Sequence, residues 1–320
     1  MFDITAMGEL LIDFTQSGFS KNGMRLFEQN PGGAVANVLC AAAKLGMNTA
    51  FIGKVGKDMH GDFLKKTLQQ ARIDTRGLLE TDAVFTTLAF VEISENGERS
   101  FSFARKPGAD TCIEPFEVDE QILKNTRIFH IGSLSLTHQP ARDATLFAIR
   151  KARDAGAVIS YDPNYRASLW KDAVEASGHM RSVLQYIDMI KISEEELGLM
   201  TDTDSIEEAC KSLHRQGIIY VAVTLGENGA FISAQNDSAY VSGFPCKVVD
   251  TTGAGDAFWG GFLHRLLKSG LKIGEYSIEE LKEHVMFANA TASCCIKRRG
   301  GIPAMPGLTE VMRVLNSSKK

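Results

Sequence analysis

Short apolar runs rich in β-branched residues alternate with segments of helical periodicity over most of the chain, and this alternation restricts the fold more than any other feature. It predicts strands at residues 4–7, 49–53, 128–131, 158–161, 189–192 and 220–224. It predicts helices at residues 34–45, 61–71, 141–155, 206–215 and 278–296, with Gly46 and Gly156 placed to end two of them. Strands that alternate with helices form a mainly parallel sheet with helices on its faces, so the predicted class is α/β.

The bulk properties fit one large domain over residues 1–320 and argue against several kinds of partner. The 35 Lys and Arg residues against 39 Asp and Glu residues give a net charge of −4, which does not favour nucleic-acid binding. No apolar run is long enough to span a bilayer and no N-terminal signal segment is evident, so we expect no membrane association and a cytoplasmic location. The six scattered cysteines lack a Cys-x-x-Cys pair and are expected to be reduced thiols, mostly buried.

One region interrupts the alternation of strands and helices. Residues 87–92 and 99–105 flank the dipeptide Asn96-Gly97, which is typical of a β-hairpin turn. A second interruption, residues 14–30, separates the first strand from the first helix and has the length to supply companion strands. We therefore predict a small β lid, formed by about 10–30 and 87–106, over the carboxyl ends of the main strands.

The segment 250–258 combines small residues, a helix start and a carboxylate. Val248 and Val249 precede it in the manner of a buried strand end, and apolar residues follow at helical spacing. Gly253 and Gly255 have no side chain to block an incoming anion, so backbone N–H groups and the helix dipole can bind it. A carboxylate beside such a site, Asp256, suits a base that deprotonates a hydroxyl nucleophile. The alternative is that Asp256 only complements the helix dipole.

Ligands of open parallel sheets bind beyond the carboxyl ends of the strands, so polar residues at these junctions are candidates for a site. Asp13 follows the first strand and can hold sugar hydroxyls, or is a solvated turn acid. Gly32 and Gly33 open the next helix, with Asn37 one turn in. Bare backbone and an amide suit a polyol, although a helix N-terminal turn also explains the glycines.

Two further junctions carry charge. Arg166 follows the strand at 158–161, where it can neutralise a transferring phosphoryl group or form a salt bridge to Asp162. Ser193 and Glu196 form a complete capping-box pattern at a helix start. Capping suffices to explain Glu196, but a carboxylate near phosphates can also order Mg²⁺ and its waters.

The glycine-rich turn 224–229 offers backbone against which a nucleotide can lie, and the small residues at 287–293 favour either helix packing or an adenine site. The Gly-x-x-x-x-Gly-Lys-Ser/Thr motif is absent, which excludes a P-loop kinase. No Gly-x-Gly-x-x-Gly follows the first strand, which disfavours a dinucleotide-dependent oxidoreductase. The seven histidines show no metal-ligand spacing.

Two segments together resemble the signatures of the ribokinase-like, or PfkB, family of carbohydrate kinases. Residues 32–37 through Gly56 are similar to its first signature, and residues 250–258 to its second. The resemblance covers nearly the whole chain and, at 8–14, 51–56, 160–166 and 191–196, is strongest to fructokinases. It implies a three-layer α/β/α core, a β lid that often joins a homodimer, and ATP-dependent phosphorylation of a sugar.

The resemblance also implies roles for individual residues. Asp256 would be the catalytic base, Gly253, Ala254 and Gly255 the anion hole, and Arg166 would lie near the transferred group. The sugar would contact Asp13, Gly32, Gly33, Asn37, Phe101, Phe103, Arg105, Arg166 and Asp256. The nucleotide would contact Lys191, Ser193, Thr224, Gly226, Gly229, Gly253, Gly255 and Asn289.

Metal roles are implied in the same way. Glu196 matches the acid that binds Mg²⁺ through water, while Ser193 stands where the family's Asn-x-x-Glu motif has Asn. A monovalent cation such as K⁺, which the family often binds, would lie beside the anion hole, and Ala304 stands where ribokinases can offer Ser. Its ligands would come from Asp250, Thr252, Cys295, Arg298 and Gly300, the last three through their carbonyls.

The leading hypothesis is an ATP-dependent kinase that phosphorylates the 6-hydroxyl of fructose. Aminoimidazole riboside and 2-keto-3-deoxygluconate are alternative substrates, because the segment 97–111 resembles riboside kinases and the turn 162–166 also resembles deoxygluconate kinases. A non-catalytic sugar-sensing relative is the alternative from another class. The carboxylate and the complete glycine loop argue against it.

Overall fold

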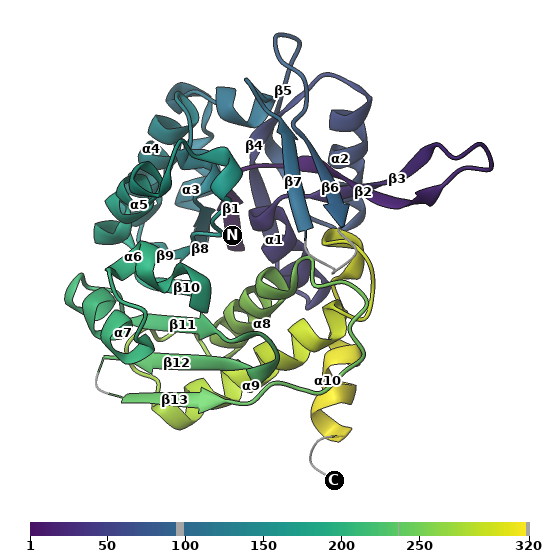
Figure 1. Ribbon diagram of the computed structural model, residues 1–320. Coiled ribbons are helices and arrows are strands. Elements are labelled where there is room, and N and C mark those ends of the chain that lie inside the picture. Colours follow the sequence, from purple (N-terminus) through teal and green to yellow (C-terminus); the bar gives the residue numbers. More distant parts are fainter. Residues whose placement is uncertain (94–98, 236, 318–320) are drawn as a thin grey trace.

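The structure is a computed structural model that describes residues 1–93, 99–235 and 237–317; the tip of the predicted hairpin, 94–98, lies outside these ranges. Its main sheet has nine strands in the order β13-β12-β11-β10-β9-β8-β1-β4-β5 (Figure 1). Their bounds are β1 Phe2–Met7, β4 Thr49–Gly56, β5 Asp74–Thr81, β8 Thr126–Gly132, β9 Val158–Asp162, β10 Met189–Ser193, β11 Tyr220–Thr224, β12 Ala230–Ala234 and β13 Asp237–Val241. In this order, the seven neighbouring strands β11, β10, β9, β8, β1, β4 and β5 run parallel. Strands β12 and β13 are antiparallel to their neighbours and form one edge.

Helices cover both faces of this sheet, because alternate residues of each central strand point to opposite sides. One core contains Met189 of β10 and residues of α1 Ala34–Lys44, α2 Met59–Gln70, α8 Ala254–Lys268 and α9 Ile278–Cys295. The other contains Ile190 and residues of α3 Glu120–Lys124, α4 Ala141–Asp154, α5 Ala173–Ser182, α6 Leu197–Thr201 and α7 Ile206–Arg215. The predicted α/β class with a mainly parallel sheet and three layers is therefore confirmed.

The C-terminal helix α10, Leu308–Ser317, packs outside these layers. Its buried residue Val311 joins a small separate cluster with Phe287 and Ala290 of α9. Among the described residues, no helix combines the length and apolar character that crossing a membrane requires.

A second, four-stranded sheet lies beside the main one, in the order β3-β2-β6-β7 (Figure 1). Its strands are β2 Leu11–Phe19, β3 Arg25–Gly32, β6 Leu88–Ile93 and β7 Arg99–Ala104. The β2–β3 and β6–β7 pairs are antiparallel, whereas β2 and β6 run parallel, so this sheet is mixed. The β2–β3 hairpin projects away from the body of the protein.

Local signals explain where several helices begin and end. Helix α2 begins at Met59, two residues before the predicted start, because the Asp58 side chain accepts hydrogen bonds from the backbone of His60 and Gly61. Gly46 and Gly156 follow α1 and α4 with φ of 92° and 85°, the left-handed conformation expected of glycines that end helices.

The prediction of a buried strand end at Val248 and Val249 is wrong. Both residues lie outside any strand, and each is 54% exposed. Their segment runs along the end of α9, where the backbone N–H groups of Val249 and Asp250 donate to the carbonyl of Ile296. It is therefore the end of α9, and not a neighbouring strand, that positions the loop before α8.

Candidate active site

A cavity of about 680 Å³ opens at the carboxyl ends of the main parallel strands and beside the small sheet. Its wall contains most of the predicted site residues, namely Asp13, Gly33, Asn37, Phe103, Arg166, Lys191, Ser193, Glu196, Thr224, Thr252, Gly253, Ala254, Gly255 and Asp256. The wall also contains residues that were not predicted, namely Glu9, Leu11, Ala34, Leu134, Asn164, Glu195 and Thr251. The fold thus brings together side chains from both halves of the sequence.

Asp256 lies in the first turn of α8, is only 8% exposed and faces this cavity. The side-chain amide of Asn37 donates a 2.7 Å hydrogen bond to its Oδ2. Burial, followed by the charge of Asp162, raises the pKa of Asp256 to about 6. The charges of Lys191 and Arg166 and the Asn37 hydrogen bond act in the opposite direction. A carboxyl with this pKa is mostly ionised at pH 7 and is well matched to accept a proton there.

The backbone before Asp256 forms the turn that the sequence predicted as an anion cradle. Gly253 caps α8 in the left-handed conformation, with φ of 76°, which favours glycine. A Cβ on Gly255 would lie 2.8 Å from Lys191 Nζ, so a side chain there would collide with the lysine. Ala254 N donates to Thr251 O at 3.2 Å, whereas the N–H groups of Gly255 and Asp256 lie in the first turn, beyond the reach of any intrahelical carbonyl.

Two cationic side chains face the same cavity. Lys191 Nζ forms a 3.0 Å ion pair with Asp162 Oδ2, and both side chains are buried. Arg166 Nη1 donates to the carbonyl of Tyr165 at 2.9 Å. The carboxylate of Asp162, which the sequence offered as a salt-bridge partner of Arg166, is held by Lys191 in a buried ion pair.

Glu196 is held by backbone on two sides. Its Oε2 accepts from Ser193 N at 2.8 Å, which completes the predicted capping box, and its Oε1 accepts from Tyr165 N at 2.7 Å. Each carboxylate oxygen has a further lone pair, so these bonds leave capacity toward the cavity. Glu196 therefore fixes the loop after β9 and also faces the cavity.

Gly32 and Gly33 lie near the small sheet, where neighbouring atoms leave little space for a side chain. A Cβ on Gly32 would lie 2.2 Å from Asp13 Oδ2, and one on Gly33 would lie 2.4 Å from the carbonyl oxygen of Glu9. Gly33 also has φ of 117° and its near neighbour is backbone, so this position requires glycine, whereas the near neighbour of Gly32 is the end of a side chain. Phe103 of β7 lines the cavity, whereas the side chain of Phe101 lies outside the described part of the structure.

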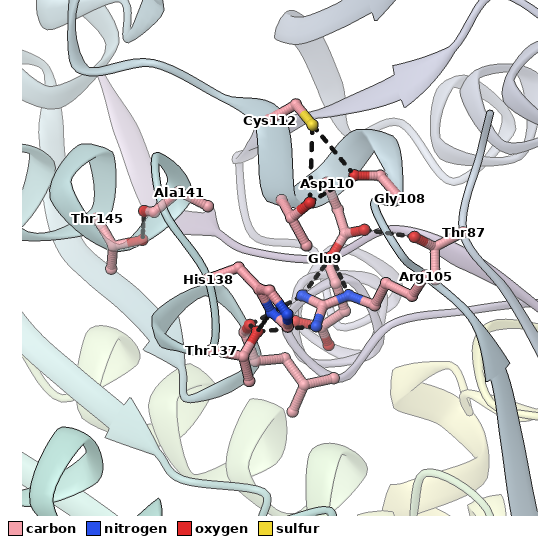
Figure 2. A network of polar contacts seen from close by, with 12 residues as sticks. Glu9, Thr87, Arg105, Gly108, Asp110, Cys112, Thr137, His138, Ala141 and Thr145 are labelled. Atoms are coloured by element: carbon pink, nitrogen blue, oxygen red, sulfur yellow. Dashed lines mark hydrogen bonds and ion pairs between the residues drawn. The ribbon is translucent and has the colours of Figure 1, made fainter. Parts of the chain in front are cut away.

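The structure does not bring Arg105 to the cavity. Its side chain is 1% exposed and forms an ion pair with Asp110 at 2.6 Å. Its two terminal nitrogens also donate to Thr137 Oγ1 at 2.8 Å and to Leu134 O at 2.9 Å (Figure 2). Arg105 therefore anchors the chain that leaves β7. The sequence placed Arg105 at the end of the predicted strand 99–105 and the resemblance implied a sugar contact, but neither indicated which way the guanidinium points.

The predicted nucleotide residues divide into two groups. Thr224 lines the cavity, but Gly226, Gly229 and Asn289 do not. A Cβ on Gly229 would lie 2.2 Å from Val241 O, so Gly229 permits a close backbone approach at β13. The Asn289 side-chain amide donates to Val241 O at 3.0 Å and to the next carbonyl at 3.1 Å, which fixes the chain after β13.

The small residues of α9 pack against α8. A Cβ on Gly261 of α8 would lie 2.7 Å from Thr291 Oγ1, so the two helices approach closely at this point. Of the two interpretations of residues 287–293, this geometry favours helix packing.

Four of the predicted cation-site residues gather beside the turn before Asp256. Asp250 accepts from Thr252 N at 2.8 Å and from Gly300 N at 2.9 Å, and Cys295 Sγ lies 3.7 Å from Thr252 O. Arg298, the fifth predicted residue, donates its backbone N–H to Cys295 O at 3.1 Å, and its side chain pairs with Glu310. Among the described residues, no cluster of three His, Cys, Asp or Glu side chains suited to a metal is present.

Glu9 is a cavity residue that the sequence reasoning missed. Its Oε1 accepts from Ala34 N at 2.6 Å, at the start of α1, while Oε2 is buried without a hydrogen-bond partner among the described residues. Burial raises the pKa of Glu9 to about 7, with hydrogen bonds from the backbone opposing the shift. The sequence signal for Glu9 was its position two residues after β1, at the carboxyl end of a central strand. The prediction for this junction named Asp13, which lies in β2.

A buried carboxylate at a helix N-terminus, two nearby cations and a polyol-sized polar cavity define a phosphotransferase-type site on an α/β fold. The model of the pfkB family carbohydrate kinases matches residues 1–307, so this chain belongs to that family. The predicted family and enzyme class, a carbohydrate kinase, are thereby confirmed.

Individual relatives extend over the whole chain. A probable fructokinase-5 from Arabidopsis thaliana is 38% identical over 320 residues, covering 99% of this chain and 98% of the relative. The crystal structure of a fructokinase with bound ATP from Xylella fastidiosa has a TM-score of 0.91 at 31% identity, covering 99% of both chains. A double-mutant fructokinase from Vibrio cholerae O395, in fructose, ADP and potassium ion bound form, has a TM-score of 0.88 at 32% identity and covers 98% of both chains.

Proposed function

We propose that this chain is an ATP-dependent fructokinase that uses Asp256 as its general base. The observation that carries this proposal is the buried Asp256 carboxylate, which faces the cavity at the start of α8 and is held there by Asn37. The similarity to fructokinases over nearly the full length supports fructose as the acceptor.

In the proposed reaction the 6-hydroxyl oxygen of fructose attacks the γ-phosphorus of ATP. Its proton passes to an oxygen of Asp256, a new O–P bond forms, and the bond from the γ-phosphorus to the bridging oxygen breaks to release ADP. The N–H groups at the start of α8 face the charge that develops on the phosphoryl oxygens. Asp13 and Asn37 line the same cavity and are proposed to hold the sugar hydroxyls.

The metal roles are part of the same proposal. Glu196 has lone pairs left after its two backbone bonds and is proposed to hold water molecules of Mg²⁺, which supplies charge neutralisation to the phosphates. Asp250 and the carbonyl of Thr252 supply oxygen atoms next to the turn before Asp256, and K⁺ is proposed to bind there, among Asp250, Thr252, Cys295 and Gly300.

A homodimer through the small sheet is proposed because this sheet carries exposed aromatic side chains. Phe19, Phe27 and Phe90 are 63%, 40% and 40% exposed, and the ring of Phe90 contacts those of Phe14 and Phe27. Exposed apolar groups gathered on one sheet are typical of a protein interface. Light scattering of the purified protein should give twice the mass of the chain, and the cytoplasmic location stays a prediction.

The proposal is tested by measuring ADP release with a series of sugars, with and without K⁺. Fructose should give the highest kcat/KM, ahead of ribose, aminoimidazole riboside and 2-keto-3-deoxygluconate. A protein that binds fructose without ADP release would instead be a sugar sensor. Faster turnover of aminoimidazole riboside or of 2-keto-3-deoxygluconate would support the kinase activity but contradict fructose as the substrate.

A further inference from the structure

Lys191 is a charged side chain buried at the carboxyl end of β10. The residue is 6% exposed, yet it forms part of the cavity wall. Removing an ammonium group from water is costly unless a carboxylate compensates it, and Asp162 Oδ2 does so at 3.0 Å. Because an ammonium carries three N–H donors, the bond to one carboxylate oxygen does not exhaust its capacity.

The ammonium lies against the anion-binding turn. Its Nζ is 2.8 Å from the position that a Cβ on Gly255 would occupy, so the absence of a side chain at Gly255 makes room for it. Asp256 follows directly in the chain, and Lys191 is one of the groups that lower its pKa. The lysine therefore lies beside both the proposed base and the proposed phosphate-binding backbone.

The surrounding charges keep Lys191 protonated. Burial alone lowers the pKa of Lys191, but the carboxylates of Asp162, Glu196 and Asp256 outweigh burial, so the net shift is upward. An excess of nearby carboxylates would repel the phosphates of ATP unless cations offset it. Alternate residues of a strand share a face, so Lys191 projects to the same side of β10 as Ser193.

We propose that Lys191 is a further catalytic residue, whose ammonium, oriented by Asp162, donates hydrogen bonds to the oxygens of the phosphoryl group during its transfer. This inference rests on the proposed kinase function. Lys191 neither gains nor loses a proton in this step, since the hydroxyl proton goes to Asp256. Asp162 is a positioning residue, because it acts by fixing the direction of the Lys191 side chain.

The chain contains a matched control in Lys54 of β4. Lys54 is 8% exposed, and its Nζ bonds both carboxylate oxygens of Glu117, at 2.7 and 2.6 Å, and Cys112 O at 3.0 Å. It does not line the cavity. The two lysines thus share burial and an ion pair on the same sheet and differ in their access to the ligand.

The test compares Lys191→Met, Lys191→Arg and the double variant Lys191→Met with Asp162→Asn, in which neither charge of the Lys191–Asp162 pair remains. We expect kcat to fall by about 10²- to 10³-fold in both methionine variants, with the KM for fructose changed less than about threefold. Lys191→Arg should recover at least about tenfold of the lost kcat, because it restores the cation. Lys54→Met together with Glu117→Gln should change kcat less than about threefold.

Two outcomes would overturn the inference. A folded double variant that retains more than about a third of the wild-type kcat would show that no ammonium acts on the phosphoryl group. A loss confined to the KM for fructose would assign Lys191 to sugar binding instead. Wild-type protein assayed in parallel separates this result from the proposed function, since only a wild type that releases no ADP with any sugar contradicts the kinase itself.

Discussion

Two buried ion pairs, Arg105–Asp110 and Lys191–Asp162, differ in how many hydrogen bonds of the cation end on other protein groups. They also differ in whether the cation reaches the cavity. The guanidinium of Arg105 bonds Asp110, Thr137 and the Leu134 carbonyl. Asp110 in turn accepts from Thr87, at the root of the small sheet. Lys191, by contrast, bonds Asp162 and faces the cavity next to Gly255.

This contrast shows that a buried charge does not by itself indicate catalysis. A guanidinium whose donors all end on protein atoms ties segments together, and here it ties the end of β7 to the loops after β8 and before α3. An ammonium held on one side by a carboxylate and open on the other can also meet a ligand. An anchoring cation and a ligand-facing cation therefore differ in two respects. These are the number of N–H donors left without a protein partner and the direction in which the side chain points.

The strongest test of the site that faces the cavity is the substitution Asp256→Asn. We expect kcat to fall by about 10²- to 10⁴-fold, because the amide cannot accept the proton of the attacking hydroxyl. The KM for the sugar should change little, since Asn37 and Asp13 remain in the wall. Steady-state ADP release measures both constants, and a variant that retains more than about a tenth of kcat would contradict Asp256 as the base.

The anchoring role of the Arg105–Asp110 pair is tested by the substitution Arg105→Met. Breaking a buried pair leaves Asp110 uncompensated, so the free energy of unfolding should fall by about 3–5 kcal/mol. Denaturant titration measures this loss. The double variant with Asp110→Asn should recover part of it, because it removes the second charge as well. A variant of unchanged stability but with a greatly raised KM for the sugar would return Arg105 to the sugar site, as the sequence first indicated.

The pH dependence of kcat/KM is a further test of the site that faces the cavity, because Asp256 lies in the cavity wall. The pKa of Asp256 is about 6, raised by burial and then by Asp162. Because only the ionised carboxylate accepts a proton, kcat/KM should fall about tenfold per unit as the pH drops below 6.

Glu9 complicates this profile and supplies its control. Its pKa of about 7 arises mainly from burial, with Asp110 raising it and Arg105 lowering it. Glu9→Gln keeps an oxygen to accept from Ala34 N but cannot ionise. The fall in kcat/KM below pH 6 should persist in this variant. Its disappearance would assign the titration to Glu9 rather than to Asp256.

The sequence predicted those parts of the fold in which local pattern and burial agree. The central strands are buried on both faces, so they appear as short apolar runs, and β11 and α7 have the predicted bounds. Strand β5 escaped prediction because it lies at the sheet edge and carries Asp74 and Arg76 instead of a continuous apolar run. Strands β12 and β13 also escaped prediction; each has only five residues, and β13 lies at the opposite edge of the sheet.

The site was predictable where a motif carries its own geometry. The turn before Asp256 and the capping box at Glu196 depend on neighbouring residues and are present in the structure. The hydrogen bond from Asn37 to Asp256 joins residues 219 positions apart, and no local signal contains it. The direction of Arg105 and the burial of Glu9 likewise depend on which loops the fold places around them.

The smallest expected effect comes from Thr87→Val, which preserves shape and removes the hydroxyl that Asp110 accepts from. Losing one hydrogen bond to a buried charge should lower the free energy of unfolding by about 1.5–3 kcal/mol, with kcat and KM unchanged. Thr67→Val is the control, because that exposed hydroxyl bonds only the carbonyl of Phe63 and its loss should stay within about 0.5 kcal/mol. If Thr87→Val instead raised the KM for the sugar at unchanged stability, the Arg105–Asp110 cluster would act on the ligand through the small sheet, and the division between anchoring and ligand-facing pairs would fail.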